Sequence, residues 1–303
     1  MRSALLLLTC TLMACGSPRP LTTFVAPADA PKTLFGGELP TYWYQGTAEL
    51  STYRLRQARY GELRDGQAVL IQVTEDFLTD RQVKNDANEN PNSAPVLKTN
   101  LIKRFTTGLY DYSIMSSVFT PTNAAQQPQT LKVTTSSQDW CGQSFTQLNY
   151  DRGASYDMQL RSYFEREGDV ATSLAADFLE DEVFNRIRIA GDALPEGTFQ
   201  VLPPTSYLLL THQDYRAYTA EAQLEAPGET TRTYVIDYPE LERRFTVTFD
   251  RAAPYVIREW TETYPDRGEL LTTTATLEAQ NQQAYWQLNA AKDAALRSEL
   301  GLR

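Results

Sequence analysis

The sequence predicts a mainly β (α+β) fold: a large, curved antiparallel sheet or half-barrel with one covering helix and a C-terminal helix. Three observations lead to this prediction. Apolar and polar residues alternate with a period of two in many segments. Turn signals such as Ala226-Pro227-Gly228-Glu229 separate those segments. The segments of the second half follow one another closely, which indicates consecutive hairpins.

The clearest strand covers residues 244–250, where Phe245, Val247 and Phe249 share one face and polar residues occupy the other. This alternation is typical of a half-buried antiparallel strand. The same pattern predicts strands at residues 47–57, 67–75, 115–120, 130–137, 156–165, 216–225, 231–238, 256–264 and 269–277.

Residues 170–189 are predicted to form the covering helix. Asp169 precedes them as an N-cap, and Gly191 lies just past the expected end. Leu174 and Phe178 are one helical turn apart, so the helix would present an apolar face.

The last segment, residues 283–300, is predicted to form the C-terminal helix. Its members near one helical face are Trp286, Ala290, Ala294 and Leu300. Residues 79–94 are rich in Asn and Asp, which predicts a long polar loop between strands.

The N-terminus predicts export. Residues 1–15 combine Arg2 with a short apolar run that suits a signal peptide and is too short to span a bilayer. The stretch Leu12-Met13-Ala14-Cys15-Gly16 resembles the bacterial lipobox, whereas Cys10 has poorer flanking residues. We therefore expect cleavage before Cys15 and acylation of that cysteine, for example with palmitate. Gly16 is not the aspartate that retains many such proteins at the inner membrane, which favours the outer membrane.

The mature chain is expected to have two parts. Residues 16–38 contain Pro18, Pro20, Pro27 and Pro31, and they predict a flexible tether that cannot build a core. Residues 39–303 are predicted to form a single β-rich domain. The lipid on Cys15 is then the expected membrane attachment, facing the periplasm or the cell surface.

Charge and cysteine content exclude several classes of protein. The net charge of −10 disfavours binding to nucleic acid, because an acidic surface repels phosphate groups. Cys141 is the one cysteine left after the lipidated residue, so no intramolecular disulfide is expected in the mature chain. The fold must rest on its core, for which many large aromatic side chains are available.

Two sets of residues are candidates for catalysis. Cys141 would need a base, and His212 is the only histidine. The alternative is that Cys141 is a small buried hydrophobe between Trp140 and Phe145. Paired carboxylates in Glu180–Glu182 suit acid–base work on a sugar, although such a run more often forms a solvated helix face.

Binding sites are less clearly indicated. Asp86, Asn88 and Asn90 alternate like the start of a calcium loop, but Pro91 and Leu97 stand where that loop needs glycine and glutamate. No metal site and no cofactor are therefore expected. The candidates to line a hydrophobic ligand cavity are Tyr42, Trp43, Tyr44, Trp140 and Trp260, with ordinary packing in the sheet as the alternative.

Several stretches resemble an uncharacterised family of bacterial envelope lipoproteins. They include YWYQGTAEL (42–50), TGLYDYSIMSSVFTP (107–121), SSQDWCGQSFTQLN (136–149) and LEDEVFNRIRI (179–189). Members carry the label "septum formation inhibitor Maf". That label conflicts with this chain, because true Maf proteins are cytoplasmic nucleotide pyrophosphatases of α/β fold. The strand-rich pattern with a covering helix is also similar to the half-barrel of LolA-like lipoprotein carriers, a likeness of architecture that does not fix function.

We therefore expect an outer-membrane-anchored lipoprotein without enzymatic activity. Its role would be to bind a hydrophobic ligand or an envelope partner protein. The alternative is an envelope hydrolase that uses Cys141 or the acidic cluster at Glu180–Glu182.

Overall fold

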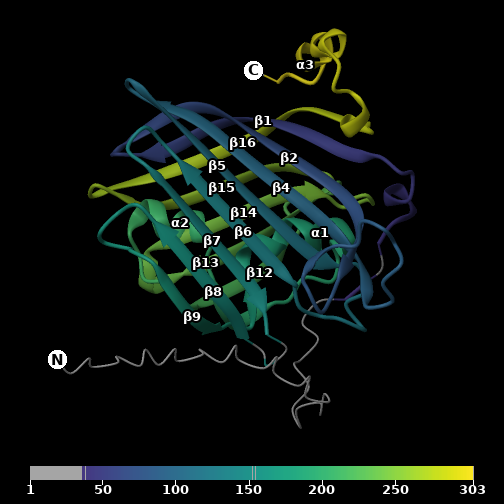
Figure 1. The fold of residues 1–303 in the computed structure, drawn as a ribbon. Helices are drawn as coiled ribbons and strands as arrows, with labels where there is room; N and C mark the ends of the chain where they lie inside the picture. The colour runs from purple at the N-terminus through teal and green to yellow at the C-terminus, as the bar shows by residue number, and fades with distance from the viewer. Residues whose placement is uncertain (1–35, 38, 152, 154, 303) are drawn as a thin grey trace, which may run out of the picture. The chain divides into compact units, whose positions relative to one another are not determined.

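The computed structural model describes residues 36–37, 39–151, 153 and 155–302. The predicted signal peptide, Cys15 and most of the predicted tether lie outside the described residues. The described residues belong to one compact unit, and most of them lie in a single large sheet. This sheet confirms the predicted fold class (Figure 1).

The sheet contains sixteen strands within the described part of the chain. They are β1 (Ala48–Arg59), β2 (Glu62–Leu78), β3 (Val83–Lys84), β4 (Ser93–Thr107), β5 (Tyr110–Pro121), β6 (Lys132–Gln138), β7 (Gln143–Tyr150), β8 (Ser155–Ser162), β9 (Val170–Ala175), β10 (Phe178–Leu179), β11 (Gly197–Leu202), β12 (Tyr218–Glu225), β13 (Thr231–Tyr238), β14 (Arg243–Asp250), β15 (Ile257–Asp266) and β16 (Glu269–Gln283).

The helices are short. They are the α-helices α1 (Val183–Ala190), α2 (Thr205–Thr211) and α3 (Leu296–Glu299), and the 3₁₀ helices η1 (Thr41–Trp43), η2 (Glu180–Glu182), η3 (Pro239–Leu241), η4 (Tyr285–Gln287) and η5 (Ala291–Ala295).

The order of strands in the sheet is β10-β11-β12-β13-β14-β15-β16-β1-β2-β4-β5-β6-β7-β8-β9, and β3 pairs with β2. Only Ala176 and Asp177 separate β9 from β10 in the chain, yet these strands lie at the two ends of the sheet. β10 and β11 are parallel, whereas neighbours such as β2 and β4 are antiparallel. Hairpin-like connections between successive strands therefore build almost the whole sheet, as the turn signals predicted.

Two helices fill the concave side of the sheet. Figure 1 shows α1 and α2 between the strands β4–β8 and the strands β12–β15. On α1, Phe184 makes edge contacts with Phe245 of β14 and Trp260 of β15. On α2, Tyr207 packs edge-on against Tyr264 of β15. The curvature of the sheet thus encloses helices and aromatic side chains rather than open space.

The predicted alternation is confirmed in β14, where Phe245, Val247 and Phe249 are buried in the main core. Burial in β5 and β12 also alternates. β4 was not predicted, because Lys98, Asn100 and Lys103 interrupt its apolar residues. β7, β11 and α2 were not predicted either. The polar segment 79–94 is mainly a loop, with the two residues of β3 inside it.

The predicted helix at 170–189 is only half correct. Residues Val170–Ala175 form β9, which pairs with β8, and the α-helix begins at Val183 and ends before Gly191. β9 contains small and β-branched residues that suit a strand, and its pairing with β8 satisfies backbone groups that a helix would satisfy internally. Asp169 is therefore not a helix cap.

The predicted C-terminal helix at 283–300 is wrong in form. β16 extends to Gln283, and the rest of the segment consists of η4, η5 and the four-residue α3. We call residues 284–302 the C-terminal arm. Ala290 has an extended backbone that accommodates a cap, in which its N–H donates to the Asp293 carboxylate over 3.0 Å. That local bond interrupts the helix that the alanine content favours.

Candidate functional site

The aromatic residues proposed to line one cavity do not share a site. Trp43 and Trp260 are each 1% exposed and belong to two different core clusters. Tyr44 and Trp140 are exposed to solvent at 66% and 69%. Tyr42 is half-buried and stands edge-on to Trp43. The expected cavity on the concave face is therefore replaced by packed helices and side chains.

The acidic cluster is buried, which corrects the prediction of a solvated helix face. Glu180 accepts hydrogen bonds from Tyr238 at 2.7 Å and from the guanidinium of Arg243, which binds both of its oxygens. Glu182 accepts from Arg186 at 2.8 Å and from Thr130 at 2.7 Å. These carboxylates are held in ion pairs as structural groups, and their arrangement gives no support to acid–base catalysis.

The third member of the cluster, Asp181, lies beside a small internal cavity of about 30 Å³. Burial raises the pKa of Asp181 to about 7, and the Glu180 carboxylate adds to the effect. Glu262 also lines this cavity, and its carboxylate lies 3.6 Å from Lys103 and 3.4 Å from Arg243. Burial opposes ionisation of Glu262, but the two cations outweigh it and lower its pKa. The cavity is large enough for about one water molecule.

A further ion pair fixes the other end of α1. Arg188 binds both oxygens of Glu49 on β1, at 2.6 and 2.5 Å, and both side chains are almost fully buried. Tyr42 donates to the same carboxylate over 2.6 Å, and the Arg188 guanidinium lies 4.8 Å from the centre of the Trp43 ring. The sequence reasoning missed this site, because the two charges are 139 residues apart.

Cys141 is exposed, so the prediction that it is buried is wrong. It lies at the turn between β6 and β7, where its N–H donates to Asp139 over 2.6 Å. The Asp139 carboxylate also raises the pKa of the thiol, which favours the unreactive protonated form. Cys141 is exposed because it lies in this tight turn. The turn could not be predicted from the spacing of apolar residues.

The structure does bring His212 into the same recess, a cavity of about 140 Å³ that Cys141 also lines. The His212 ring, however, is engaged by Glu167, with 2.6 Å between Nδ1 and the carboxylate. No hydrogen bond joins the imidazole to the thiol among the described residues. The recess therefore lacks the short base–nucleophile contact that a cysteine hydrolase requires.

The calcium-like segment Asp86, Asn88 and Asn90 lies in the loop between β3 and β4. Asp86 is 3.7 Å from Lys84, a cation that competes with any metal ion. Within the described ranges, no group of three or more His, Cys, Asp or Glu side chains is placed to hold a metal ion.

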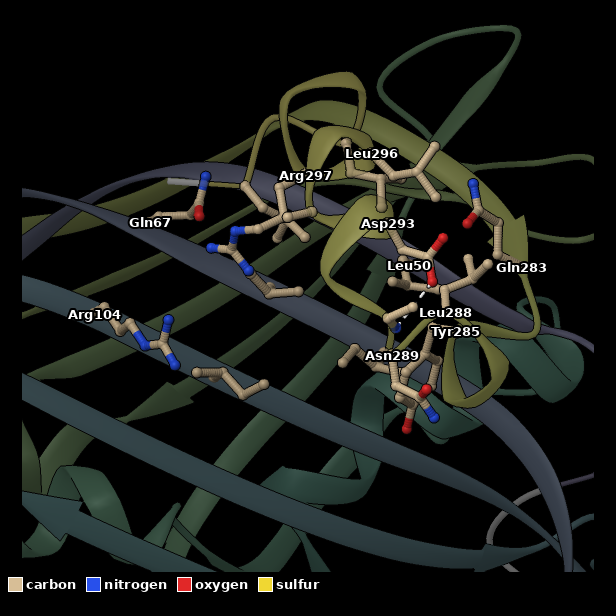
Figure 2. A pocket seen from close by; sticks show the side chains of 17 residues that line it. Leu50, Gln67, Arg104, Gln283, Tyr285, Leu288, Asn289, Asp293, Leu296 and Arg297 are labelled. Atoms are coloured by element: carbon tan, nitrogen blue, oxygen red, sulfur yellow. Dashed lines mark hydrogen bonds between the residues drawn. The ribbon is translucent and has the colours of Figure 1, made fainter.

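A pocket that the sequence reasoning missed lies on the other, convex face of the sheet. The C-terminal arm crosses β1, β2 and β4 and leaves a cavity of about 380 Å³ beneath it, shown in Figure 2. The apolar floor comes from the sheet, through Leu50, Val69, Ile71 and Ile102. The apolar roof comes from the arm, through Leu288, Ala290, Ala294, Leu296, Leu300 and Leu302.

Specific contacts hold the arm in place. Leu300 is buried in a cluster with Ala48 and Leu50 of β1. Its carbonyl accepts a hydrogen bond of 2.9 Å from Thr52, and the carbonyl of Gly301 accepts one of 2.6 Å from Gln67. Gly301 has a φ of +62°, which lets the chain turn so that both carbonyls face the sheet. The arm is thereby fixed at its far end and spans the pocket.

Polar groups gather at the rim of the pocket. Figure 2 shows the side chains of Arg104 and Arg297 at the same end of the pocket as Gln67. Gln67 and Arg104 also line an adjoining open cavity of about 590 Å³ along β2, β4 and β5. The pocket is thus mainly apolar, with Gln283, Asn289 and Asp293 as further polar lining residues, and it is open to water at its cationic end.

One signal in the sequence does point to this pocket. Residues 68–71 read Ala-Val-Leu-Ile, an unbroken apolar run inside a strand. A half-buried strand alternates, so such a run indicates that both faces are covered. Ala68 and Leu70 face the core, while Val69 and Ile71 face the arm.

Among the residues that the structure covers, no helix combines the length and the apolar character needed to cross a membrane. No protein-family model matches the chain, and a search of curated proteins finds no match. Among solved structures, the chain is similar to a beta-barrel-like protein of domain of unknown function DUF1849 from Brucella abortus. The TM-score is 0.46 and the identity 8%, over 81% of this chain and 99% of that chain.

Proposed function

We propose that this chain is an envelope lipoprotein that binds a hydrophobic ligand without transforming it. The observation that carries the proposal is the pocket between the C-terminal arm and the convex face of the sheet. Its volume of about 380 Å³ falls within the usual range for small-molecule sites, about 300–1,000 Å³.

The lining of the pocket supports a hydrophobic ligand. Leucine, isoleucine, valine and alanine side chains form both the floor and the roof. Leu288 in the roof is 39% exposed and the neighbouring Trp286 is 46% exposed. A ligand that filled the pocket would cover apolar surface that now faces water, at about 25 cal/mol per Å².

The proposal favours binding over catalysis because the candidate catalytic residues are otherwise engaged. Glu180 and Glu182 are neutralised by buried arginines, and His212 is bound by Glu167. The alternative of an envelope hydrolase therefore has weaker support than a binding protein.

Ligand binding is tested with the full chain carrying Cys15→Ala, purified without detergent. A neutral fluorescent apolar probe should bind with enhanced emission, and native mass spectrometry should show co-purified lipid. A matched variant, Val69→Asp, places a charge on the floor of the pocket and should abolish probe binding. If the wild-type pocket binds neither lipid nor probe, the ligand proposal fails and a partner-binding role for this surface is favoured.

The anchor is tested separately by growing cells with labelled palmitate. We expect label on the wild-type protein in the membrane fraction and none on the Cys15→Ala variant. Each buried acyl methylene contributes about 0.8 kcal/mol to membrane affinity, and stable anchoring takes more than one chain. An unlabelled, soluble wild-type protein would contradict the lipoprotein proposal.

A further inference from the structure

We infer that the pocket under the C-terminal arm selects single-chain amphiphiles with an anionic head group, and that Arg104 binds that head group. This inference rests on the proposed function, since it names the class of hydrophobic ligand. It is argued from the charges at the rim, the direction in which the pocket opens and the chemistry of its lining.

Arg104 is a cation on the convex face of β4. It is exposed, and within the described ranges of the chain no carboxylate forms an ion pair with it. Its cross-strand neighbours are Gln67 on β2 and Ser113 on β5, which are both uncharged. An available guanidinium is unexpected in a chain with a net charge of −10, where acidic side chains outnumber basic ones.

The carboxylates that line the pocket or the adjoining cavity have other partners. Asp293 accepts the N–H of Ala290, which caps η5. Asp111 accepts a hydrogen bond of 2.7 Å from Thr106, and Asp65 lies 3.4 Å from Arg56. None of the three forms an ion pair with Arg104 among the described residues, so its guanidinium is available to an anionic ligand.

A second guanidinium approaches from the opposite wall. Arg297 belongs to α3 in the arm, whereas Arg104 belongs to the floor, and both line the pocket. Figure 2 shows the two side chains at the end where Gln67 lies. Guanidinium groups bind carboxylates and phosphates through paired N–H donors, which gives both affinity and orientation.

The openings of the pocket fit an amphiphile. The cationic end continues into the open cavity of about 590 Å³, so a bound head group would stay hydrated there. Away from that end, Leu50, Tyr285 and Leu288 line the pocket, and an alkyl chain would lie against them. The polar side chains at the same end are Gln283, Asn289 and Asp293, and the carboxylate of Asp293 disfavours an anionic head group there (Figure 2). A ligand with one charged end and one apolar end matches this division, whereas a purely apolar ligand would leave Arg104 unused.

The test compares ligands that share one alkyl chain and differ only in the head group: dodecanoate, dodecanol and dodecylammonium. Each displaces the neutral probe from the full chain carrying Cys15→Ala. We expect dodecanoate to bind about tenfold more tightly than dodecanol, as one charge-assisted contact allows. Dodecylammonium should bind more weakly than dodecanol.

Two variants test whether Arg104 causes the preference for an anionic head group. Arg104→Gln should remove the preference for dodecanoate and leave dodecanol unchanged, and Arg104→Glu should reverse the preference toward dodecylammonium. Arg54→Gln is the control, because Arg54 is also an exposed arginine on the outer side of the sheet, and it does not line the pocket. The thermal unfolding midpoint of each variant shows that it is folded.

The outcomes separate this inference from the proposed function. If the three ligands displace the probe equally in the wild-type chain, the pocket binds hydrophobic ligands without anion selectivity, and the inference fails alone. If the probe binds and none of the three ligands displaces it, the inference fails while binding of an apolar ligand stands. If the probe itself does not bind, the proposed function fails as well. A preference for dodecanoate that survives in Arg104→Glu would also overturn the role of Arg104.

Discussion

The two faces of the sheet use charge in opposite ways. On the concave face, arginines and glutamates are buried and matched, as in the pairs Arg188–Glu49 and Arg243–Glu180. On the convex face, the pocket under the arm is mainly apolar and has Arg104 and Arg297 at its rim. Buried charges are tolerated when they are paired and hydrogen-bonded, so the concave side is a closed structural unit.

This difference shows where binding is possible. On the concave side, buried ion pairs hold α1 in place, and the cavity beside Asp181 has a volume of about 30 Å³. The convex side has covered apolar strand residues with an arm that fills the space incompletely. Five experiments test this comparison, and they are given in order of decreasing expected effect on stability.

The largest effect should come from breaking one buried pair. Arg188→Met leaves the Glu49 carboxylate buried without its cation, which should lower the free energy of unfolding by about 4 kcal/mol. The double variant Glu49→Gln with Arg188→Met should recover part of that loss. Urea unfolding measures both. Arg258→Met is the control, because Arg258 pairs with Asp250 on the surface, and a loss of more than about 1 kcal/mol there would contradict the comparison.

A substitution in the C-terminal arm should loosen the arm without unfolding the rest of the sheet. Leu300→Ala removes its buried anchor and should weaken docking of the arm by about 2–3 kcal/mol. Hydrogen exchange should then speed up in residues 284–302, while exchange in β14 stays slow. Leu109→Ala, at a leucine that is 82% exposed, should change neither. Equal acceleration in β14 and the arm would show that the two regions unfold together.

The free energy of unfolding should depend on pH because the buried cluster contains Asp181. Asp181, whose pKa is raised to about 7, keeps a proton that the unfolded chain releases near pH 4. The folded chain therefore binds more protons across that window, and the free energy of unfolding falls as the pH rises. Asp181→Asn should therefore raise the free energy of unfolding more at pH 8 than at pH 4.

Glu262, in the same cluster, should change the free energy of unfolding with pH in the opposite direction. Its pKa is lowered in the folded chain, so its stabilisation is present above the pKa of the unfolded glutamate and is lost as the pH falls. Glu262→Gln should therefore destabilise the protein more at pH 7 than at pH 3. If both variants changed stability equally at all pH values, the cluster would not titrate as described.

The smallest effect on stability should come from Cys141, which lies outside both regions. In a chain with Cys10 and Cys15 replaced by serine, a thiol reagent should label native Cys141 without prior denaturation, because the side chain is exposed. Because the pKa of the thiol is raised, labelling should be slow at neutral pH and should become faster as the pH increases and the thiolate forms. The labelled protein should unfold at an unchanged temperature. Labelling only after denaturation would show that Cys141 is buried.

The sequence by itself determined the class of fold and most strands of the second half. Period-two alternation reports which residues of a strand face a core, and hairpins between neighbouring strands are local. Even the errors follow from local reasoning: residues 170–175 and 290–295 lie in predicted helices, but pairing with β8 and the Asp293 cap decide their conformation.

Only the tertiary structure decided what covers each face of the sheet. The arginine that binds Glu180, the hydroxyl that donates to Glu182 and the carboxylate that binds Arg188 all belong to strands or loops far away in the chain. The pocket likewise depends on where the arm crosses β2, and no local pattern specifies that crossing. Burial and ion pairing are properties of contacts between segments far apart in the chain. The same acidic run can therefore be a solvated surface or a structural core, and the sequence alone does not distinguish them.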